Sequence, residues 1–171
     1  MKKRIFLGLI VLVSTTLILG LANAKGNVGH KTPTNTTTNS TVFIHNINEA
    51  NGQLLLTSDE IQWYEDEEAN LQFREHEEDA NEQEALDGYY IVNDNSELQS
   101  LRISPNAEVI MQIYDQPGVT AEPELNPDEA VSLKQFKALF NQMDRLDLRD
   151  YPFHLTIKNG EVIKIVQQFI P

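Results

Sequence analysis

Cysteine is absent from the 171-residue sequence, and basic residues are scarce. Without thiols the chain can form no disulfide, no cysteine-ligated zinc site and no thiol nucleophile. Lys and Arg together number 13 against 26 Asp and Glu, which gives a formal net charge of -13 at pH 7. Because binding to nucleic-acid phosphates or to anionic lipid depends on clustered Lys and Arg, this charge balance argues against both partners.

Several catalytic motifs are also missing. The sequence has no Gly-x-Ser-x-Gly or Ser-x-x-Lys pattern of a serine nucleophile and no glycine-rich phosphate loop. None of the histidines shows the His-Glu-x-x-His or His-x-His spacing that directs two imidazoles to one metal; they are His30, His45, His76 and His154. We therefore expect no cofactor and assign no metal ligand. A glycosidase-type pair of carboxylates stays open, because its members meet only in space.

The first 24 residues have the organisation of a secretory signal peptide. A basic start is followed by a largely apolar stretch, residues 5–21, and by Ala22-Asn23-Ala24, the small-x-small form of a signal-peptidase site. Cleavage between Ala24 and Lys25 would remove three bases and leave 10 against 26 acids, a net charge of -16. The alternative is an uncleaved membrane anchor, because the apolar stretch is near the lower limit of about 17 to 25 residues for a bilayer span. Both readings place the remaining chain outside the cytoplasm, either secreted or at the extracellular surface, and cleavage leaves it without a membrane attachment.

Two further segments follow. Residues 25–40 are rich in Thr, Asn, Gly and Pro and contain one apolar side chain, so we expect a flexible linker. Residues 41–171 are numerous enough to form one hydrophobic core without disulfides or metals, so we expect a single β-rich domain.

The strand pattern begins with a predicted hairpin. Residues 41–47 and 53–57 are rich in β-branched residues and Leu, and Asn51-Gly52 between them favours a tight turn. Residues 89–92 and 108–114 are the next predicted strands. Three prolines between residues 115 and 128 exclude a regular element there.

A final hairpin is predicted around Asn159-Gly160, with two possible registers. A two-residue loop would pair Leu155 with Lys164. A three-residue loop pairs Leu155 with Ile163 and Phe153 with Ile165. We favour the three-residue loop, because it gathers the apolar side chains on one face and leaves His154, Thr156 and Lys164 on the other.

Two helices complete the predicted fold. The first, about residues 66–86, is acidic and has a narrow apolar stripe that includes Phe73 and His76, so we expect it to lie on the surface. The second, about residues 132–144, has Ser132 as its N-cap and an apolar stripe that covers the sheet. This order predicts an α+β domain with a small curled antiparallel sheet or an OB-like partial barrel.

Acidic and aromatic side chains supply the candidate binding residues. Residues 59–87 hold 13 of the 26 acids and a single base, Arg74. This negative charge has two functional interpretations, attraction of a cationic partner and weak Ca²⁺ binding, beside a structural one, a solvated helix face that keeps the protein soluble. Trp63, Tyr89 and Tyr90 are candidates for a stacking surface for a sugar or peptide. No metal ligand is assigned, because the acidic runs lack the central Gly of a calcium loop.

Four short stretches of the sequence carry a resemblance: residues 87–93, 103–109, 131–136 and 159–171. They resemble uncharacterised small secreted proteins of Bacillus-like Gram-positive bacteria. The resemblance implies an exported, compact β-rich domain, and it carries no activity to transfer.

Two functions follow as hypotheses. The first is a non-enzymatic binding module of the Gram-positive cell envelope or medium, with its acidic face toward a cationic or envelope partner. The alternative is a carboxylate-based hydrolase that acts on cell-wall polymer.

The signal-peptide hypothesis predicts the N-terminus of the exported protein. Expression in a Gram-positive host, followed by N-terminal sequencing of the protein recovered outside the cells, should give Lys25 as the first residue. Recovery of the intact N-terminus with the membrane fraction would instead identify an uncleaved anchor.

Overall fold

The computed structural model describes residues 35–77, 84–115, 123–142 and 146–170. The chain divides into two units, Met1–Thr32 and Pro33–Pro171, and all described residues belong to the second. The predicted signal peptide, its Ala24–Lys25 cleavage site and most of the predicted linker lie outside the described residues. Among the residues that are described, no helix combines the length and the apolar character that a bilayer crossing requires.

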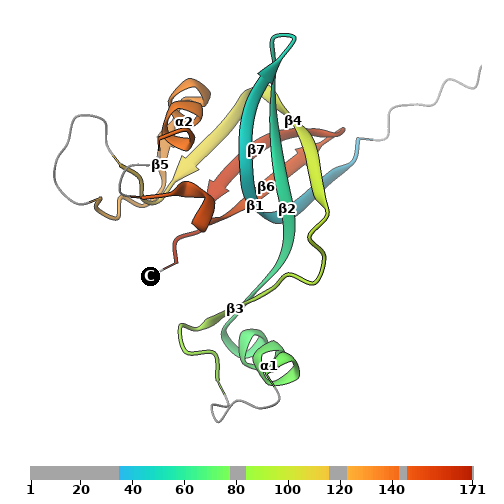
Figure 1. Ribbon diagram of the computed structural model, residues 1–171, viewed down its shortest axis with the longest axis vertical. Coiled ribbons are helices and arrows are strands. Elements are labelled where there is room, and N and C mark those ends of the chain that lie inside the picture. Colours follow the sequence, from blue (N-terminus) through green and yellow to red (C-terminus); the bar gives the residue numbers. More distant parts are fainter. Residues whose placement is uncertain (1–34, 78–83, 116–122, 143–145, 171) are drawn as a thin grey trace, which may run out of the picture. The chain divides into compact units, whose positions relative to one another are not determined.

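Five strands close into a barrel (Figure 1). They are β1 (Thr37–Ala50), β2 (Gln53–Glu65), β4 (Leu98–Met111), β6 (Pro152–Lys158) and β7 (Glu161–Gln167). The order around the barrel is β1, β2, β4, β7, β6 and back to β1, and only the pairing of β4 with β7 is parallel. The predicted α+β class with an OB-like barrel is confirmed, and the sheet closes completely.

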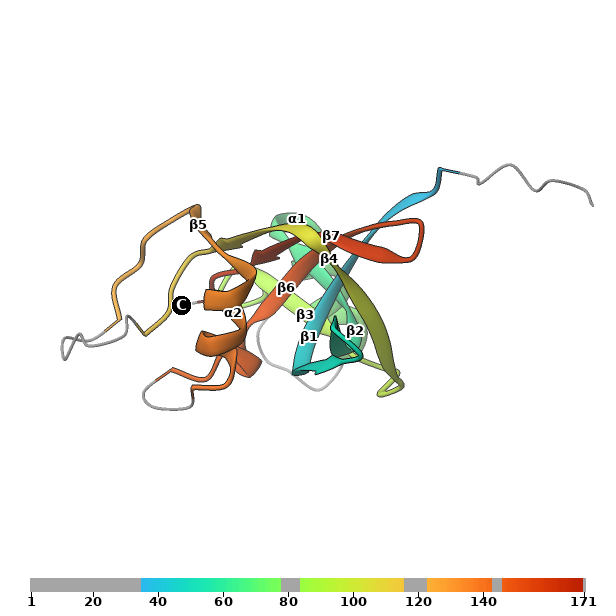
Figure 2. The same cartoon turned by 90° about the horizontal axis from the view of Figure 1, so that it is seen from above.

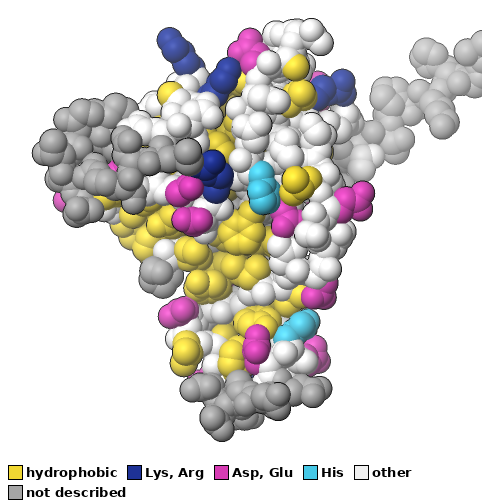
Figure 3. Space-filling view, viewed as in Figure 1, with side chains coloured by type: hydrophobic (Ala, Val, Ile, Leu, Met, Phe, Trp, Pro, Cys, Tyr) yellow, Lys and Arg dark blue, Asp and Glu magenta, His cyan; other side chains and the backbone are white. Residues whose placement is uncertain are grey.

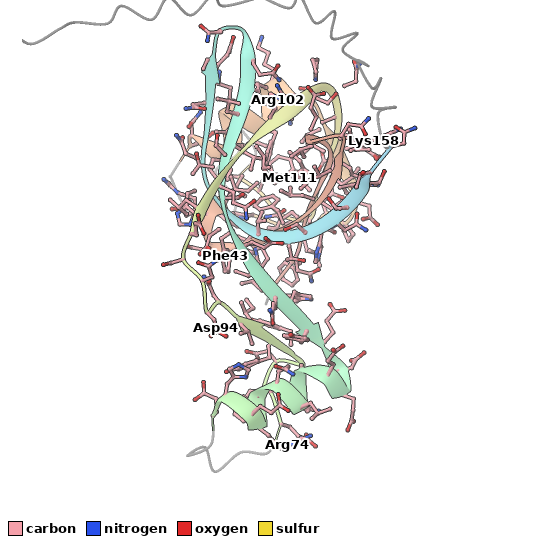
Figure 4. All side chains as sticks on the ribbon, turned by 90° about the vertical axis from the view of Figure 1, so that its right-hand side faces the viewer. Phe43, Arg74, Asp94, Arg102, Met111 and Lys158 are labelled. Atoms are coloured by element: carbon pink, nitrogen blue, oxygen red, sulfur yellow. The ribbon has the colours of Figure 1, made fainter. Side chains whose placement is uncertain are left out.

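Burial of alternate residues on these strands forms the core. The barrel interior holds side chains that are at most 1% exposed: Val42, Ile44, Leu56, Ile103, Val109, Met111, Phe153, Leu155, Val162 and Ile165. Figure 4 shows Met111 inside the barrel, whereas Arg102 and Lys158 lie at its upper rim. Because no disulfide is possible, removal of this apolar surface from water is the main term that holds the barrel together.

The first hairpin has the predicted turn. Ala50 pairs with Gln53, and the two turn residues Asn51 and Gly52 have φ values of 53° and 74°. Positive φ at both positions matches the right-handed twist of the strands and is adopted readily by Asn-Gly. Both strands are longer than predicted. β1 already begins at Thr37 and pairs with β6 there, so the last four residues of the predicted linker belong to the barrel.

The favoured register of the final hairpin is wrong. Lys158 pairs with Glu161 across a two-residue turn, and Leu155 lies opposite Ile165, not opposite Ile163. A β-bulge at Ile163 explains the difference, because one extra residue in β7 shifts every later pair by one position. The bulge buries Val162 and leaves Ile163 half-buried.

The second helix packs on the barrel as predicted but is shorter. α2 (Leu133–Phe140) begins after Ser132, whose hydroxyl accepts a hydrogen bond of 3.2 Å from the backbone N–H of Gln135. Figure 2 shows α2 beside the barrel strands. Its buried side chains join the barrel core, with the Phe136 ring centroid 5.8 Å from that of Phe153. A 3₁₀ helix, η1 (Leu148–Asp150), and a short edge strand, β5 (Glu129–Val131), complete this side of the barrel.

The acidic helix is also shorter than predicted. α1 (Asp66–His76) ends at His76, with Glu77 as its C-cap, and Ala85 and Leu86 are not helical. Residues 78–83 lie outside the described part. α1 packs on β3 (Tyr89–Val92), a short strand that pairs with the last four residues of β2. We call α1, β3 and residues 62–65 of β2 the arm; in Figure 1 it lies below the barrel.

The strand predicted at residues 108–114 is the end of a longer element. β4 runs from Leu98 and ends at Met111. The backbone N–H groups of Gln112 and Ile113 then donate to the side-chain Oε1 of Gln167, at 2.9 and 3.0 Å. This fully buried Gln167 therefore continues the contact between β4 and β7 after their backbone pairing stops.

Tyr114 gives the fold a testable dependence on alkaline pH. Burial and, next, the 2.7 Å hydrogen bond that its hydroxyl donates to Glu129 raise the pKa of Tyr114 to about 12. Since the unfolded pKa is about 10, the neutral phenol stabilises the fold fully below pH 10, and this contribution is lost as the pH rises from about 10 to about 12.

We expect the free energy of unfolding of wild type to fall more steeply with pH in this window than that of Tyr114→Phe, by at most about 1.4 kcal/mol per pH unit. Urea unfolding at a series of pH values measures both slopes, and equal slopes would contradict the assignment.

Candidate functional site

The candidate site lies where the arm leaves the barrel. β1 and β2 pair from the Ala50–Gln53 turn to Thr41 and Ile61. Beyond that point β1 continues along β6, whereas β2 continues into the arm and pairs with β3. The two strands of the first hairpin therefore diverge, and the last residues of β2 form a two-stranded ribbon with β3.

The ribbon has two faces, because successive residues of a strand point to opposite sides. Trp63, Glu65, Tyr89 and Ile91 share one face, since Trp63 pairs with Ile91 and Glu65 with Tyr89. The other face carries Tyr64, Tyr90 and Val92 and packs against α1. Of the three predicted binding residues, the structure thus brings Trp63 and Tyr89 together and places Tyr90 on the opposite side.

Trp63 and Tyr89 form a stacked aromatic pair. Their ring centroids are 4.6 Å apart, and the ring planes differ by 14°. Both side chains are half-buried. The Nε1 atom of Trp63 is buried and has no hydrogen-bond partner within the described part of the chain. A buried indole N–H normally has an acceptor, so this donor is available to one.

Tyr90 instead anchors α1. Its ring contacts Phe73 edge to face at a centroid distance of 5.7 Å and lies 5.9 Å from the ring of His76. Its hydroxyl donates a 3.1 Å hydrogen bond to Glu77. Burial first, and then the hydrogen bond and negative charge of Glu77, raise the pKa of Tyr90 above its usual value. These contacts are structural, since they attach the helix to the ribbon.

A pocket of about 340 Å³ opens beside the stacked pair, and we call it the acidic pocket. Trp63 and Tyr89 line it together with three carboxylates, those of Glu65, Asp66 and Asp87, and with Gln168 and Phe169 from the C-terminal segment. A backbone hydrogen bond of 3.0 Å from Asp66 N–H to the carbonyl of Gly88 joins the start of α1 to the residue that precedes β3. Asp87 is therefore brought to the same pocket as the neighbouring residues Glu65 and Asp66, although it is distant from them in sequence.

A second pocket, of about 380 Å³, lies between the diverging strands β1 and β2, and we call it the polar pocket. Trp63 forms part of its lining as well. The outer face of the barrel supplies a chain of hydrogen bonds here: Thr41 Oγ1 lies 3.0 Å from His154 Nδ1, and His154 Nε2 lies 3.0 Å from Gln168 Oε1. The final hairpin was correctly predicted to place His154, Thr156 and Lys164 on one outward face, and all three line this pocket.

The surface around the two pockets is mixed in character. Figure 3 shows apolar side chains spread across the front of the barrel, with acidic side chains around them and on the arm. The first turn of α1 adds three acids, Asp66, Glu67 and Glu68, and all of them are exposed. Figure 4 shows Arg74, the base of the acidic segment, on α1 and away from the barrel.

Metal binding finds no geometric support in the part of the chain that the structure describes. No group of three or more His, Asp or Glu side chains there is placed to hold one ion. Weak Ca²⁺ binding therefore stays a prediction. His45 is exposed at the bulge in β1, and His30 lies outside the described residues.

Comparison with known proteins gives no further guidance. No family model, curated protein or solved structure matches the sequence or the fold.

Three features of the site were not predicted from the sequence. They are the stacking of Trp63 on Tyr89, the contribution of Gln168 and Phe169, and the link between Thr41 and His154. The first could have been found if β2 had been extended to Glu65, because Trp63 then lies on the alternate face shared with Tyr89. The other two depend on pairings between distant strands.

Separate substitutions of the two neighbouring tyrosines should have different effects. Trp63 is the only tryptophan of the chain, so its fluorescence reports the stacked pair alone. We expect Tyr89→Ala to shift Trp63 emission to longer wavelength and to increase its quenching by acrylamide. Tyr90→Ala should leave the emission unchanged and make α1 more sensitive to proteases, since each lost aromatic contact contributes about 0.5 to 1.5 kcal/mol. An equal emission shift in both variants would contradict the two-faced ribbon.

Proposed function

We propose that this protein is an exported, non-catalytic binding module that holds a cationic group of a cell-envelope or extracellular partner in the acidic pocket. The observation that supports this function is the convergence of three carboxylates and a stacked aromatic pair on one pocket. An ammonium or guanidinium group gains both from the carboxylates and from the electron-rich face of a nearby aromatic ring.

The pocket favours a cation over other ligands. Its charged lining residues are all acidic, and the adjoining first turn of α1 carries further exposed acids. This field attracts cations over a range of about one Debye length, roughly 10 Å at 0.1 M salt, and repels phosphate and other anions. The stacked pair adds an apolar surface for the methylene groups of a Lys or Arg side chain. A cationic peptide segment or an amine-bearing envelope polymer has this combination.

A carboxylate-based hydrolase of cell-wall polymer is the second candidate, because the same three carboxylates share one pocket. Hydrolysis by a carboxylate pair releases soluble products, whereas binding alone releases none. Incubation of the purified protein with peptidoglycan and wall glycans, followed by chromatography of the soluble products, separates the two functions. Release of products that disappears in Glu65→Gln, Asp66→Asn or Asp87→Asn would establish the hydrolase.

The binding function predicts salt-dependent affinity for cations. An oligolysine peptide should bind with an affinity that falls as salt is raised from about 0.1 M to about 1 M, which shortens the Debye length from about 10 Å to about 3 Å. The triple variant Glu65→Gln/Asp66→Asn/Asp87→Asn should weaken binding about tenfold, since several exposed ionic contacts are lost together. Isothermal calorimetry measures both effects, and Ca²⁺ in place of the peptide tests the weak calcium site.

A matched control separates the pocket from net charge. Glu67→Gln/Glu68→Gln/Glu75→Gln removes the same number of charges from exposed positions of α1 that do not line the pocket. We expect this variant to bind oligolysine about as well as wild type. An equal loss of oligolysine affinity in the two triple variants would show that the attraction is nonspecific. Retention on envelope fractions that does not change with salt concentration would exclude the ionic mechanism.

A further inference from the structure

The polar pocket has a different chemistry from the acidic pocket, although the two share Trp63. Its charged lining side chains are one acid, Glu60, and one base, Lys164. Its other polar side chains are hydroxyls, amides and an imidazole: Asn39, Ser40, Thr41, Gln62, Tyr64, His154 and Thr156. In a chain of strongly negative charge, this balanced lining gives neither a cation nor an anion a clear advantage.

The shape of the pocket follows from the strand pairing. Residues 37–40 of β1 pair with β6, and residues 62–65 of β2 pair with β3, so the two strands diverge from Thr41 and Ile61 onward. Residues of β1, β2, β6 and β7 line the space between them. Thr41 pairs with both His154 and Ile61, so Thr41, His154 and Trp63 lie on one face. Thr41 and His154 belong to paired barrel strands, which fix their positions before any ligand arrives.

Trp63 supplies an aromatic wall of the pocket. The stack with Tyr89 fixes the plane of the indole ring, whose Nε1 is buried without a hydrogen-bond partner in the described part of the chain. A ligand that offers a flat C–H surface would pack against this ring.

The hydrogen-bonding groups suit a ligand with many hydroxyls. In the series from Thr41 through His154 to Gln168, the amide Oε1 of Gln168 can only accept, so His154 donates through Nε2–H and its Nδ1 accepts from the Thr41 hydroxyl. Asn39 and Thr156 form a second pair, in which the hydroxyl of Thr156 donates to the amide oxygen of Asn39 at 3.1 Å. A sugar hydroxyl is both donor and acceptor and can join either network.

The diverging strand edges raise the competing possibility of an added peptide strand. The side chains of Ser40 and Glu60 form a 2.8 Å hydrogen bond where the pairing of β1 and β2 ends, and Gln99 adds a second contact to Glu60. These contacts join the edges that a peptide would have to separate. Recognition of an added strand also relies on apolar pockets for alternate side chains, and the aliphatic lining residues here are Ile61, Leu155 and Val166, of which Ile61 and Leu155 are buried.

We infer that the polar pocket binds an uncharged glycan, with a sugar ring against Trp63 and its hydroxyls on the groups of Thr41 and His154. The volume of about 380 Å³ is within the usual range for small-ligand sites, about 300 to 1,000 Å³. The inference rests on the proposed binding function and assigns it a second ligand class, so that an envelope polymer with both hydroxyls and amines would engage both pockets.

Titration of Trp63 fluorescence tests this site directly. The probes are uncharged glucan and N-acetylglucosamine oligosaccharides, from tri- to hexasaccharide, at concentrations up to the millimolar range. We expect a saturable change in emission with at least one series. The variant Thr41→Val, which keeps the side-chain shape and removes the hydroxyl, should raise Kd about three- to tenfold. By calorimetry, Trp63→Phe should also weaken binding, because the smaller ring offers less surface for a sugar to pack against.

Controls make each outcome decisive. Thr57→Val is the same substitution at a half-buried position of β2 outside the pocket and should leave Kd unchanged. The triple variant of the acidic pocket should keep glycan binding while it loses oligolysine, and this result supports both sites. Oligolysine binding with no saturable response to either oligosaccharide series would overturn the glycan inference and leave the proposed function intact. A response confined to an uncharged extended peptide, or glycan binding that Thr41→Val and Trp63→Phe do not weaken, would also overturn it.

Discussion

The pairing of β2 with three other strands is the constraint on which the remaining structure depends. Its first part lies between β1 and β4 and helps to close the barrel, and its last four residues pair with β3. The strand therefore belongs to the core and to the arm at once. If it ended at Ile61, the barrel could still close, but Trp63 would have no ribbon on which to meet Tyr89, and neither pocket would have its shared wall.

The barrel explains how a polar site can be rigid in a chain without covalent cross-links. Residues that point inward from β1, β6 and β7 are buried almost completely, so these strands are fixed by the apolar core. Their outward-facing neighbours, such as Thr41 and His154, are on the same fixed backbone, because successive strand residues point to opposite faces. The acidic pocket is supported differently, by the short ribbon, by α1 and by the C-terminal segment.

Much of the fold could be predicted from local sequence signals, whereas the site could be predicted only in part. Asn51-Gly52 specifies a tight turn by its backbone preference, and Ser132 marks a helix start by its capping hydroxyl. The bulge at Ile163 has no comparable local signal, because it arises from the fit of β7 between β4 and β6. Alternation along a strand already separates Tyr89 from Tyr90. The approach of Gln168 and Phe169 to the arm depends on long-range closure, which no short stretch of sequence encodes.

Closure also limits when the fold can form. β7 is the last strand in chain order, yet it lies between β4 and β6 and is the parallel partner of β4. The barrel therefore cannot close until β7 has been synthesised, even if the β1–β2 hairpin has already formed. Such nonlocal pairing slows folding and delays burial of the interior. A chain of this topology can complete its interior only after its last strand has been synthesised.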